Sequence, residues 1–407
     1  MKLQRFAFFS LTTVLAALLF SCASSPSLPP EIPAEGDGSA TGELVPPEQD
    51  SQTVEPPLPS RLVLTFGGDI MAHIENFRMA DYRLIYKDIE TIIQNDDLTF
   101  ANLETPVHGG RPYESYPTFN VQPPYAQAAI DAGFDVFSLA NNHTNDQGYE
   151  GMVRTLEFFT SKEAEGVHSA GIKPEGHQGL THRLIEKDGW RVLFVAFTEI
   201  LNSFADYQKL DYVAPAAARR KELAQELAQL RQDNPCDLFV VSLHTCEDEY
   251  VHEITQVRRD FYRLLLDNGV DIVWANHPHL AKEWEVFTAE GADFPTAMAM
   301  YALGNTISGQ RRDPQFTKPE TNRDYTGDGY LVQVTFEKDG ADQPFRMVEV
   351  TPHLITTYID GDNNYLIRRL TDEFIQELRS QGNQKWADYL AARKTLMERI
   401  GRKDVVR

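Results

Sequence analysis

Short apolar runs recur along the chain, and each ends in a group of polar residues. Apolar runs of about four to eight residues are typical of strands buried inside a layered sheet. The pattern therefore predicts buried strands whose ends carry polar chemistry. The five runs, with the polar residues that follow them, are residues 62–68 before Asp69, 98–101 before Asn102 and Glu104, 134–140 before Asn142 and His143, 238–243 before His244, and 271–275 before His277 and His279.

Segments with the apolar spacing of helices lie between these runs. Strands that alternate with helices predict a wound α/β sheet. Further β-rich runs follow, and two packed sheets flanked by helices would use all of these strands. Residues 371–402 predict one or two amphipathic helices packed on the surface. The helical segments are 84–93, 125–132, 149–162, 214–231 and 253–266, and the further β-rich runs are 183–197, 284–287, 297–303, 330–336 and 346–359.

The polar strand ends are candidates for a metal site. In wound α/β sheets, ligands bind beyond the carboxyl ends of the strands, so we expect the five polar groups to meet at one edge. Carboxylate, amide and imidazole donors in this mixture suit divalent Zn, Mn or Fe. A lone histidine at a strand end is more often structural, but the His277-x-His279 pair comes with an aspartate, a glutamate and a further histidine at matching positions. The sequence therefore predicts a metal site.

The N-terminus has the layout of an export signal. Lys2 and Arg5 precede an apolar run over residues 6–20, which ends at Ser21 and Cys22. This ending resembles the lipobox, in which the cysteine is acylated and the preceding residues are removed. We expect residues 1–22 to be a lipoprotein signal with Cys22 as the lipidated residue. The alternatives are a plain secretory signal or an uncleaved anchor helix.

Residues 23–60 are rich in Ser, Pro, Glu and Gly and contain few large apolar side chains. Such a segment cannot bury enough surface to offset the entropy of ordering, so we expect a disordered tether. A tether behind a lipid anchor predicts a location in the cell envelope, either on the outer side of the cytoplasmic membrane or in the periplasm and outer membrane.

The formal net charge of −22 restricts the partners. A field of this sign repels nucleic acid, so we exclude nucleic acid as a partner. The same field argues against direct binding of anionic lipid. An anionic substrate would need a local metal or a few basic groups. After acylation of Cys22, only Cys236 and Cys246 remain, and in an exported protein they would either pair or stay free.

Five ordered motifs carry a family resemblance. They are the segments Phe66-Gly-Gly-Asp-Ile-Met71, Phe100-Ala-Asn-Leu-Glu-Thr-Pro106, residues 137–148, residues 271–279 and residues 299–305. In this order the chain resembles the CapA family of capsule and poly-gamma-glutamate biosynthesis proteins, which is similar to the calcineurin-like metallophosphoesterases. The resemblance implies a four-layer α/β/β/α sandwich over residues 61–360, with residues 361–407 as a C-terminal helical appendage.

The resemblance also implies roles for particular residues. Asp69 would be the first-strand ligand, Glu104 would bridge two metals, and Asn142 would be an amide ligand. His143 would act as the general acid. The imidazole set would be completed by His244, His277 and His279. One or two Mn, Zn or Fe ions would then activate a water and neutralise charge on a phosphoryl or carboxylate oxygen.

Two departures from the family pattern stand out. The phosphoesterase pattern expects a second ligand two residues beyond Asp69, where this chain has Met71, a poor ligand for these metals. His73 would compensate, unless it is an ordinary polar loop residue. After His244, Thr245 and Cys246 replace the Trp-Gly that is common in CapA proteins. Cys246 would be either a soft ligand or, as we favour, a buried or disulfide-bonded cysteine.

Four further residues have a functional and a structural interpretation. Asn102 would orient Glu104 or the substrate, or close a turn. Asp146 would fix the tautomer of His143, or cap a helix. Arg311 and Arg312 would hold an anionic chain, although a solvated loop is the favoured interpretation.

These observations support two hypotheses of different class. The first is an envelope-anchored, metal-dependent hydrolase that acts on a phosphoester or on the backbone of an anionic polymer such as poly-gamma-glutamate. The second is a non-catalytic accessory lipoprotein that binds the polymer for export and uses the metal to bind carboxylates. Either would work with a polymer synthase or export complex at the membrane.

Overall fold

The computed structural model describes residues 60–340 and 343–406. These residues belong to one compact unit that spans Pro56–Arg407. The expected signal, Cys22 and all but the last residue of the expected tether lie outside the described residues. Within residues 60–340 and 343–406, no helix combines the length and the apolar character needed to cross a bilayer.

The first sheet has eight strands and combines parallel and antiparallel pairing. Its order is β14-β13-β12-β1-β2-β3-β4, with β11 paired to β1. Strands β1 to β4 run parallel, whereas β12, β13 and β14 add antiparallel neighbours beside β1. Its strands are β1 (Ser60–Ile70), β2 (Leu98–Leu103), β3 (Val136–Ser138), β4 (His168–Ala170), β11 (Asn305–Ile307), β12 (Asp328–Lys338), β13 (Arg346–Ile359) and β14 (Tyr365–Arg369).

The second sheet has seven strands in the order β15-β9-β10-β8-β7-β6-β5. Its centre, formed by β6, β7, β8 and β10, is parallel, β5 is antiparallel to β6, and β9 is antiparallel to β10 but parallel to β15. Its strands are β5 (His182–Lys187), β6 (Trp190–Thr198), β7 (Leu238–His244), β8 (Ile272–Asn276), β9 (Trp284–Thr288), β10 (Ala297–Met300) and β15 (Arg402–Val406).

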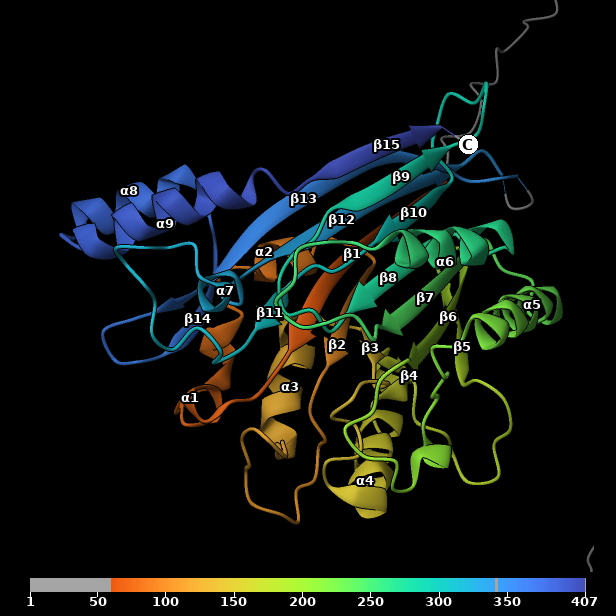
Figure 1. Ribbon diagram of the computed structural model, residues 1–407, viewed down its shortest axis with the longest axis horizontal. Coiled ribbons are helices and arrows are strands. Elements are labelled where there is room, and N and C mark those ends of the chain that lie inside the picture. The colour runs from red at the N-terminus through yellow and green to blue at the C-terminus, as the bar shows by residue number, and fades with distance from the viewer. Residues whose placement is uncertain (1–59, 341–342, 407) are drawn as a thin grey trace, which may run out of the picture. The chain divides into compact units, whose positions relative to one another are not determined.

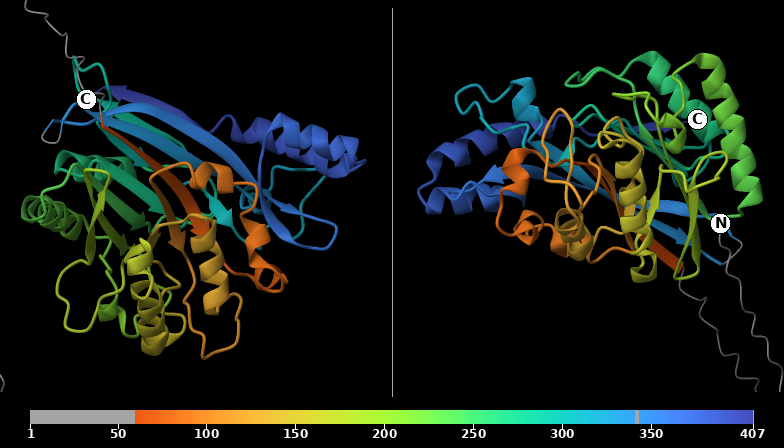
Figure 2. Two further views of the ribbon diagram at one scale, coloured as in Figure 1. Left: turned by 180° about the vertical axis from the view of Figure 1, so that it is seen from behind. Right: turned by 90° about the horizontal axis from the view of Figure 1, so that it is seen from below.

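The helices cover the outer faces of the two sheets (Figures 1 and 2). One apolar cluster joins the first sheet to α2, α3 and α4, a second lies between the sheets, and a third joins the second sheet to α5 and α6. The expected four-layer α/β/β/α order is thereby confirmed. The helices are α1 (Ile74–Phe77), α2 (Glu90–Ile93), α3 (Pro123–Ala132), α4 (Gly148–Thr160), α5 (Ala217–Asp233), α6 (Gln256–Asp267), α7 (Asn322–Tyr325), α8 (Asp372–Ser380) and α9 (Gln384–Met397), and the 3-10 turns are η1 (Tyr82–Ile85), η2 (Glu163–Glu165) and η3 (Tyr207–Lys209).

The helix expected over residues 84–93 is wrong as a continuous element. The segment divides into η1 and the single turn α2. Asp81 caps η1 by accepting a hydrogen bond from the Arg83 backbone N–H at 3.0 Å. Between the two turns, Asp88 accepts a hydrogen bond from the Arg369 backbone N–H at 2.7 Å. Tertiary contacts therefore divide a segment whose apolar spacing suited one helix.

The C-terminal segment, residues 361–407, contains two helices, within the expected one or two, and two unexpected strands, β14 and β15. Helices α8 and α9 pack on β13 and β14 through their own small apolar cluster. They lie at one end of the two sheets, where Tyr389 of α9 donates to Asp324 of α7 (Figures 1 and 2). Strand β15 then pairs in parallel with β9 and forms the edge of the second sheet. The segment expected as a helical appendage thus contributes to the main fold.

Candidate metal centre

The polar strand ends meet where the two sheets adjoin. In the first sheet, Asp69 pairs in register with Asn102, and Glu104 follows directly after β2. In the second sheet, His244 ends β7, opposite Asn276 at the end of β8. His277 and His279 follow β8 with left-handed φ angles of 106° and 57°. These unusual backbone angles turn both imidazoles into the junction.

A close approach of two backbones sets the position of Asp69. The Asp69 N–H donates to the Gly304 carbonyl at 3.1 Å. A Cβ on the preceding residue, Gly68, would lie only 1.9 Å from the same carbonyl oxygen. Glycine is thus required at position 68 because a side chain would push the two segments apart.

Two overlapping groups of buried side chains can hold a metal ion. Within each group, the ligand atoms lie within 4.8 Å of one another. One contact of 3.8 Å joins His279 Nε2 to Glu104 Oε1, and another of 3.7 Å joins His244 Nε2 to the same oxygen. Glu104 therefore links the two groups. The groups are Glu104 with His277 and His279, and Asp69 with Glu104 and His244.

Glu104 shows that these residues fit a cation. Its side chain is 0 % exposed, and neither carboxylate oxygen has a hydrogen-bond partner. Burial, together with the nearby charge of Asp69, raises the pKa of Glu104 well above its usual value. A buried carboxylate without a partner costs several kcal/mol, and a bound cation would remove that cost.

The lowered pKa values of two of the histidines suit metal binding. Burial, followed by the charge of neighbouring histidines, lowers the pKa of both His244 and His277 well below the usual value. Burial acts the same way on His279, but its contact with Asp69 Oδ2 at 3.2 Å outweighs it, so the pKa of His279 is raised. Neutral imidazole is the metal-binding form.

A shell of asparagines orients these ligands. Asn102 donates to Asp69 Oδ1 at 2.8 Å, which gives it a position beside the cluster and not a turn-closing role. Asn142 Oδ1 lies 2.7 Å from His244 Nε2, so the expected amide ligand is adjacent to an expected imidazole ligand. Asn305 Oδ1 lies 3.1 Å from His279 Nδ1. Amide partners of this kind fix ligand rotamers and tautomers.

His143 and Asp146 form a pair beside the cluster. His143 Nδ1 lies 2.7 Å from Asp146 Oδ2, and the same oxygen accepts the Phe119 backbone N–H at 2.7 Å. The ring of Phe119 meets the His143 ring edge-on, with the centroids 4.7 Å apart. Burial raises the pKa of Asp146, while the His143 contact acts in the opposite direction. The carboxylate orients the imidazole, as the functional interpretation of Asp146 requires.

The position of Met71 carries no metal ligand. Its side chain is buried, and its backbone carbonyl accepts a hydrogen bond from the Tyr125 hydroxyl at 2.7 Å. His73 lies nearby, with Nδ1 accepting the Gly309 N–H at 3.2 Å. This bond occupies one ring nitrogen, and His73 does not belong to either buried ligand group.

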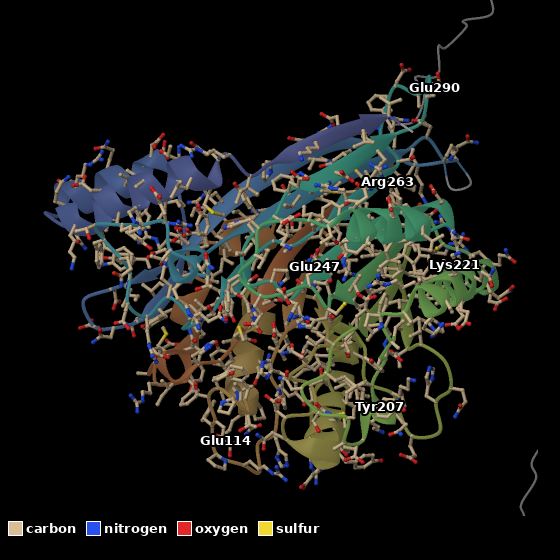
Figure 3. All side chains as sticks on the ribbon, in the orientation of Figure 1. Glu114, Tyr207, Lys221, Glu247, Arg263 and Glu290 are labelled. Carbon is tan, nitrogen blue, oxygen red and sulfur yellow. The ribbon has the colours of Figure 1, made fainter. Side chains whose placement is uncertain are left out.

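An open cavity of about 670 Å³ leads to the cluster. His143, His279 and Met71 line its inner part, and Tyr116 and Tyr250 line its walls. Glu114, labelled in Figure 3, marks the loop between β2 and α3 that carries Tyr116, and Glu247 marks the segment after β7 that carries Tyr250. A cavity of this size admits several units of a linear ligand or one small molecule.

The two expected arginines lie in different surroundings. Arg312 lines the cavity and its side chain is 66 % exposed. Both predictions for Arg311, the favoured solvated loop and the binding of an anionic chain, are wrong. It is 1 % exposed, and its guanidinium bonds Asp328 at 2.7 Å and Thr356 at 2.7 Å. Its charge is neutralised in the core between β12 and β13 and does not face the cavity.

Cys236 and Cys246 are free thiols, each half-buried. Cys246 Sγ lies 3.4 Å from an Arg258 guanidinium nitrogen and 3.6 Å from Glu199 Oε2. It therefore contacts a buried ion cluster and not the metal ligands. Of the two alternatives left open by the sequence, a disulfide and free thiols, the structure shows free thiols, and Cys246 has a structural role as a half-buried residue.

Three residues of the site had no predicted role. Asn305 was visible as the end of a motif, but its contact with His279 joins positions far apart in sequence. Asn202, in an irregular loop, lies 3.3 Å from both His143 Nδ1 and Asn142. Tyr250 lines the cavity from a segment without strand or helix signals. The sequence analysis did not identify this segment, and the acidic and aromatic character of residues 247–250 is the signal that could have done so.

A family model and two relatives each match more than half of this chain. The family described as "Bacterial capsule synthesis protein PGA_cap" matches residues 63–310. The capsule biosynthesis protein CapA of Bacillus anthracis is 25% identical over 77% of this chain and 74% of its own length. The PGA biosynthesis protein CapA of Bacillus subtilis (strain 168) is 24% identical over 72% of this chain and 71% of its own.

Two solved structures are similar at a coarser level. The calcineurin-like phosphoesterase YfkN of Bacillus subtilis aligns with a TM-score of 0.39 and 13% identity, over 82% of this chain and all of that one. The NAD nucleotidase of Haemophilus influenzae aligns with a TM-score of 0.41 and 10% identity, over 84% and 68% of the two chains.

Proposed function

Because the chain belongs to the PGA_cap family of bacterial capsule synthesis proteins, we propose that it processes an anionic capsule polymer or a phosphoester as a metal-dependent hydrolase. The observation that carries this proposal is Glu104, a buried carboxylate without a partner, among buried histidines. The name of the Bacillus subtilis relative, a PGA biosynthesis protein, supports a polymer of the poly-gamma-glutamate type, and that of the Bacillus anthracis relative supports a capsule polymer.

The residues of the chain divide the chemical work. Divalent Mn, Zn or Fe ions held by the buried cluster would supply positive charge that polarises a phosphoryl or carbonyl oxygen. His143 lines the cavity and protonates the departing oxygen or nitrogen. The Asp146 carboxylate accepts the Nδ1–H of His143, so the acid form of the ring carries a proton on both nitrogens and delivers the one on Nε2. The Phe119 ring covers one edge of His143 and limits its exchange with solvent.

A second function has one specific observation in its favour. The expected second ligand is replaced by buried Met71, which leaves fewer donors for a pair of ions. A single ion would still bind a carboxylate of the polymer, even if no nucleophile were activated. In that case the protein would be a polymer-binding accessory of an export or synthase complex.

The test compares metal content and turnover in purified full-length protein. We expect stoichiometric metal in the wild type, and a loss of at least half of it in Glu104→Gln and His279→Ala, because each variant removes a ligand. His143→Ala should keep its metal and its melting temperature while losing hydrolysis of a gamma-linked glutamate oligomer or of bis(p-nitrophenyl) phosphate by about a hundredfold or more.

The outcomes separate the two functions. Metal in the wild type without hydrolysis of either probe, but with binding of the oligomer, would favour the accessory function. A wild type that takes up no metal after reconstitution would refute the hydrolase.

We further propose that the protein is anchored in the cell envelope through a lipid on Cys22, near its polymer synthase or export partners. The sequence at Lys2, Arg5 and residues 6–22 supports this location. Membrane fractionation after labelling with a fatty-acid analogue should place the label on wild type and not on Cys22→Ser. Equal labelling of both would refute the anchor.

A further inference from the structure

The mouth of the cavity carries two arginines in different electrostatic settings. Arg312 has carboxylates near it, Glu75 at 3.8 Å and Asp313 at 3.6 Å. Arg323 also lines the cavity, and within residues 60–340 and 343–406 no carboxylate lies within ion-pair distance of it. Its charge is therefore available to a ligand.

Arg323 is held in place by an aromatic ring. Its guanidinium carbon lies 4.7 Å from the centroid of the Tyr250 ring, and its Nη1 donates to the Tyr250 hydroxyl at 3.2 Å. Gln310 donates to the same hydroxyl, also at 3.2 Å. A guanidinium has five N–H donors, and this bond uses one. The stacked arginine is thus oriented in advance, with donors left for a planar anion.

Tyr250 connects this arginine to the metal cluster. Its φ angle is 62°, a left-handed conformation that a bulky residue rarely adopts, and its backbone N–H donates to the Pro278 carbonyl at 3.0 Å. The ring lies 6.1 Å from the His279 ring, between centroids. Such strained positions cost about 1–3 kcal/mol and cluster at ligand sites. The left-handed conformation of Tyr250 places its ring between His279 and Arg323.

The arginine charge also reaches the inner wall of the cavity. Burial first, then the charges of His279 and His143, and after them those of Arg323 and Arg312, lower the pKa of His73 to about 3. Apart from the two arginines and the histidines, the charged side chains that line the cavity are acidic: Glu75, Glu249 and Asp313. An anionic ligand therefore has two places of favourable potential, the metal cluster at the inner end and Arg323 at the mouth.

We propose that Arg323, stacked on Tyr250, is a specificity-determining residue that binds a second anionic group of the substrate while the reacting group lies at the metal cluster. This inference rests on the proposed function and narrows its substrate to molecules with at least two anionic groups, either carboxylates or phosphates. A linear polyanion meets the requirement, and a monoanion does not.

The test measures binding to manganese-loaded, full-length protein in detergent by titration calorimetry. The probes are a gamma-linked glutamate decamer, the neutral gamma-linked glutamine decamer, and tripolyphosphate. Arg323→Ala should bind the glutamate decamer or tripolyphosphate about tenfold more weakly, because a charge-assisted contact is lost. Arg323→Lys should recover part of the affinity, since it keeps the charge but not the planar fork.

Two variants control the interpretation. Arg154→Ala removes an equally charged, 52 % exposed arginine outside the cavity and should bind like wild type. Tyr250→Phe keeps the ring but removes the hydroxyl, and should weaken binding by about two- to threefold. Metal content should be unchanged in all four variants.

The outcomes are distinct. A loss confined to the glutamate decamer identifies a carboxylate ligand, and a loss confined to tripolyphosphate identifies a phosphate ligand. If wild type binds an anionic probe and Arg323→Ala binds it equally well, the subsite is refuted while the proposed function stands. If metal-loaded wild type binds neither anionic probe, the subsite and the proposed polymer function fall together.

Discussion

At the scale of single residues, the site depends on how closely two backbones approach. Gly68 precedes the ligand Asp69, and the Gly304 carbonyl lies against it and accepts the Asp69 N–H. No side chain takes part in this contact between two backbones, yet it determines where the Asp69 carboxylate lies. Gly68 therefore helps to position the expected ligand Asp69, although it has no side chain that could bind a metal.

Gly68→Ala should lower the free energy of unfolding by about 1–3 kcal/mol, because its Cβ would overlap the Gly304 carbonyl and force the strands apart. The displacement of Asp69 should also lower the metal content. Urea unfolding and elemental analysis measure the two effects. Gly361→Ala is the control, since its Cβ would meet nothing within 4 Å, and it should change stability by no more than about 0.5 kcal/mol. Equal stability of the two variants would contradict the argument.

At the scale of elements, a buried carboxylate joins two connecting segments. Asp211 lies between η3 and α5, is 0 % exposed, and accepts the Thr181 backbone N–H at 2.8 Å. Its nearest cation is Lys173, with Nζ 3.6 Å from Oδ1. The contact fastens the segment before α5 to the segment before β5. Burial outweighs these bonds and raises the pKa of Asp211 to about 7.

The raised pKa makes stability depend on pH with a defined sign. The pKa of Asp211 is near 4 in the unfolded state and about 7 in the folded state. At pH values between these two, the folded state keeps a proton on Asp211 that the unfolded state has lost, so the free energy of unfolding falls as pH rises. In Asp211→Asn this part of the slope, at most about 1.4 kcal/mol per pH unit, should disappear. Chemical denaturation at pH 4, 5, 6 and 7 measures it. Asp131→Asn, on an exposed position of α3, should keep the wild-type slope, and a wild-type slope in Asp211→Asn would contradict the assignment.

At the scale of the whole molecule, the charge of −22 sets the long-range field. Self-repulsion at this charge destabilises the compact state, and salt screens it over about 10 Å at 0.1 M. The same field repels a polyanion at a distance. Local positive groups, the metal cluster and Arg323, are therefore needed to bind one.

Raising sodium chloride from 10 to 150 mM at pH 7 should raise the melting temperature by roughly 1–2 °C, which corresponds to about 1 kcal/mol at an unfolding entropy of about 2.1 cal/mol/K per residue. Scanning calorimetry of metal-free protein measures the change without the effect of bound ions. At a pH near the isoelectric point of about 4.9 the same salt step should have little effect. A salt effect of equal size at both pH values would show that self-repulsion is not its cause.

Sequence alone was enough for the features that local chemistry dictates. Apolar periodicity identified most strands and helices, because burial imposes it directly on the residues. Ligands in wound α/β sheets bind at the carboxyl ends of the strands, and this rule alone predicted that Asp69, Glu104 and His244 lie close together. Ordered motifs identified the family, because several motifs in sequence order rarely arise by chance.

Only the tertiary structure decided features that depend on distant segments. Arg311 and Arg312 are neighbours with the same chemistry, yet Asp328 draws one into the core and the cavity receives the other. Strand β15 has mostly exposed side chains, and pairing with β9 is what makes it a strand. Tyr250 and Arg323 are 73 positions apart and meet through folding. Periodicity records whether a residue is buried, but not which partner buries it, and that choice is made by packing of the whole chain.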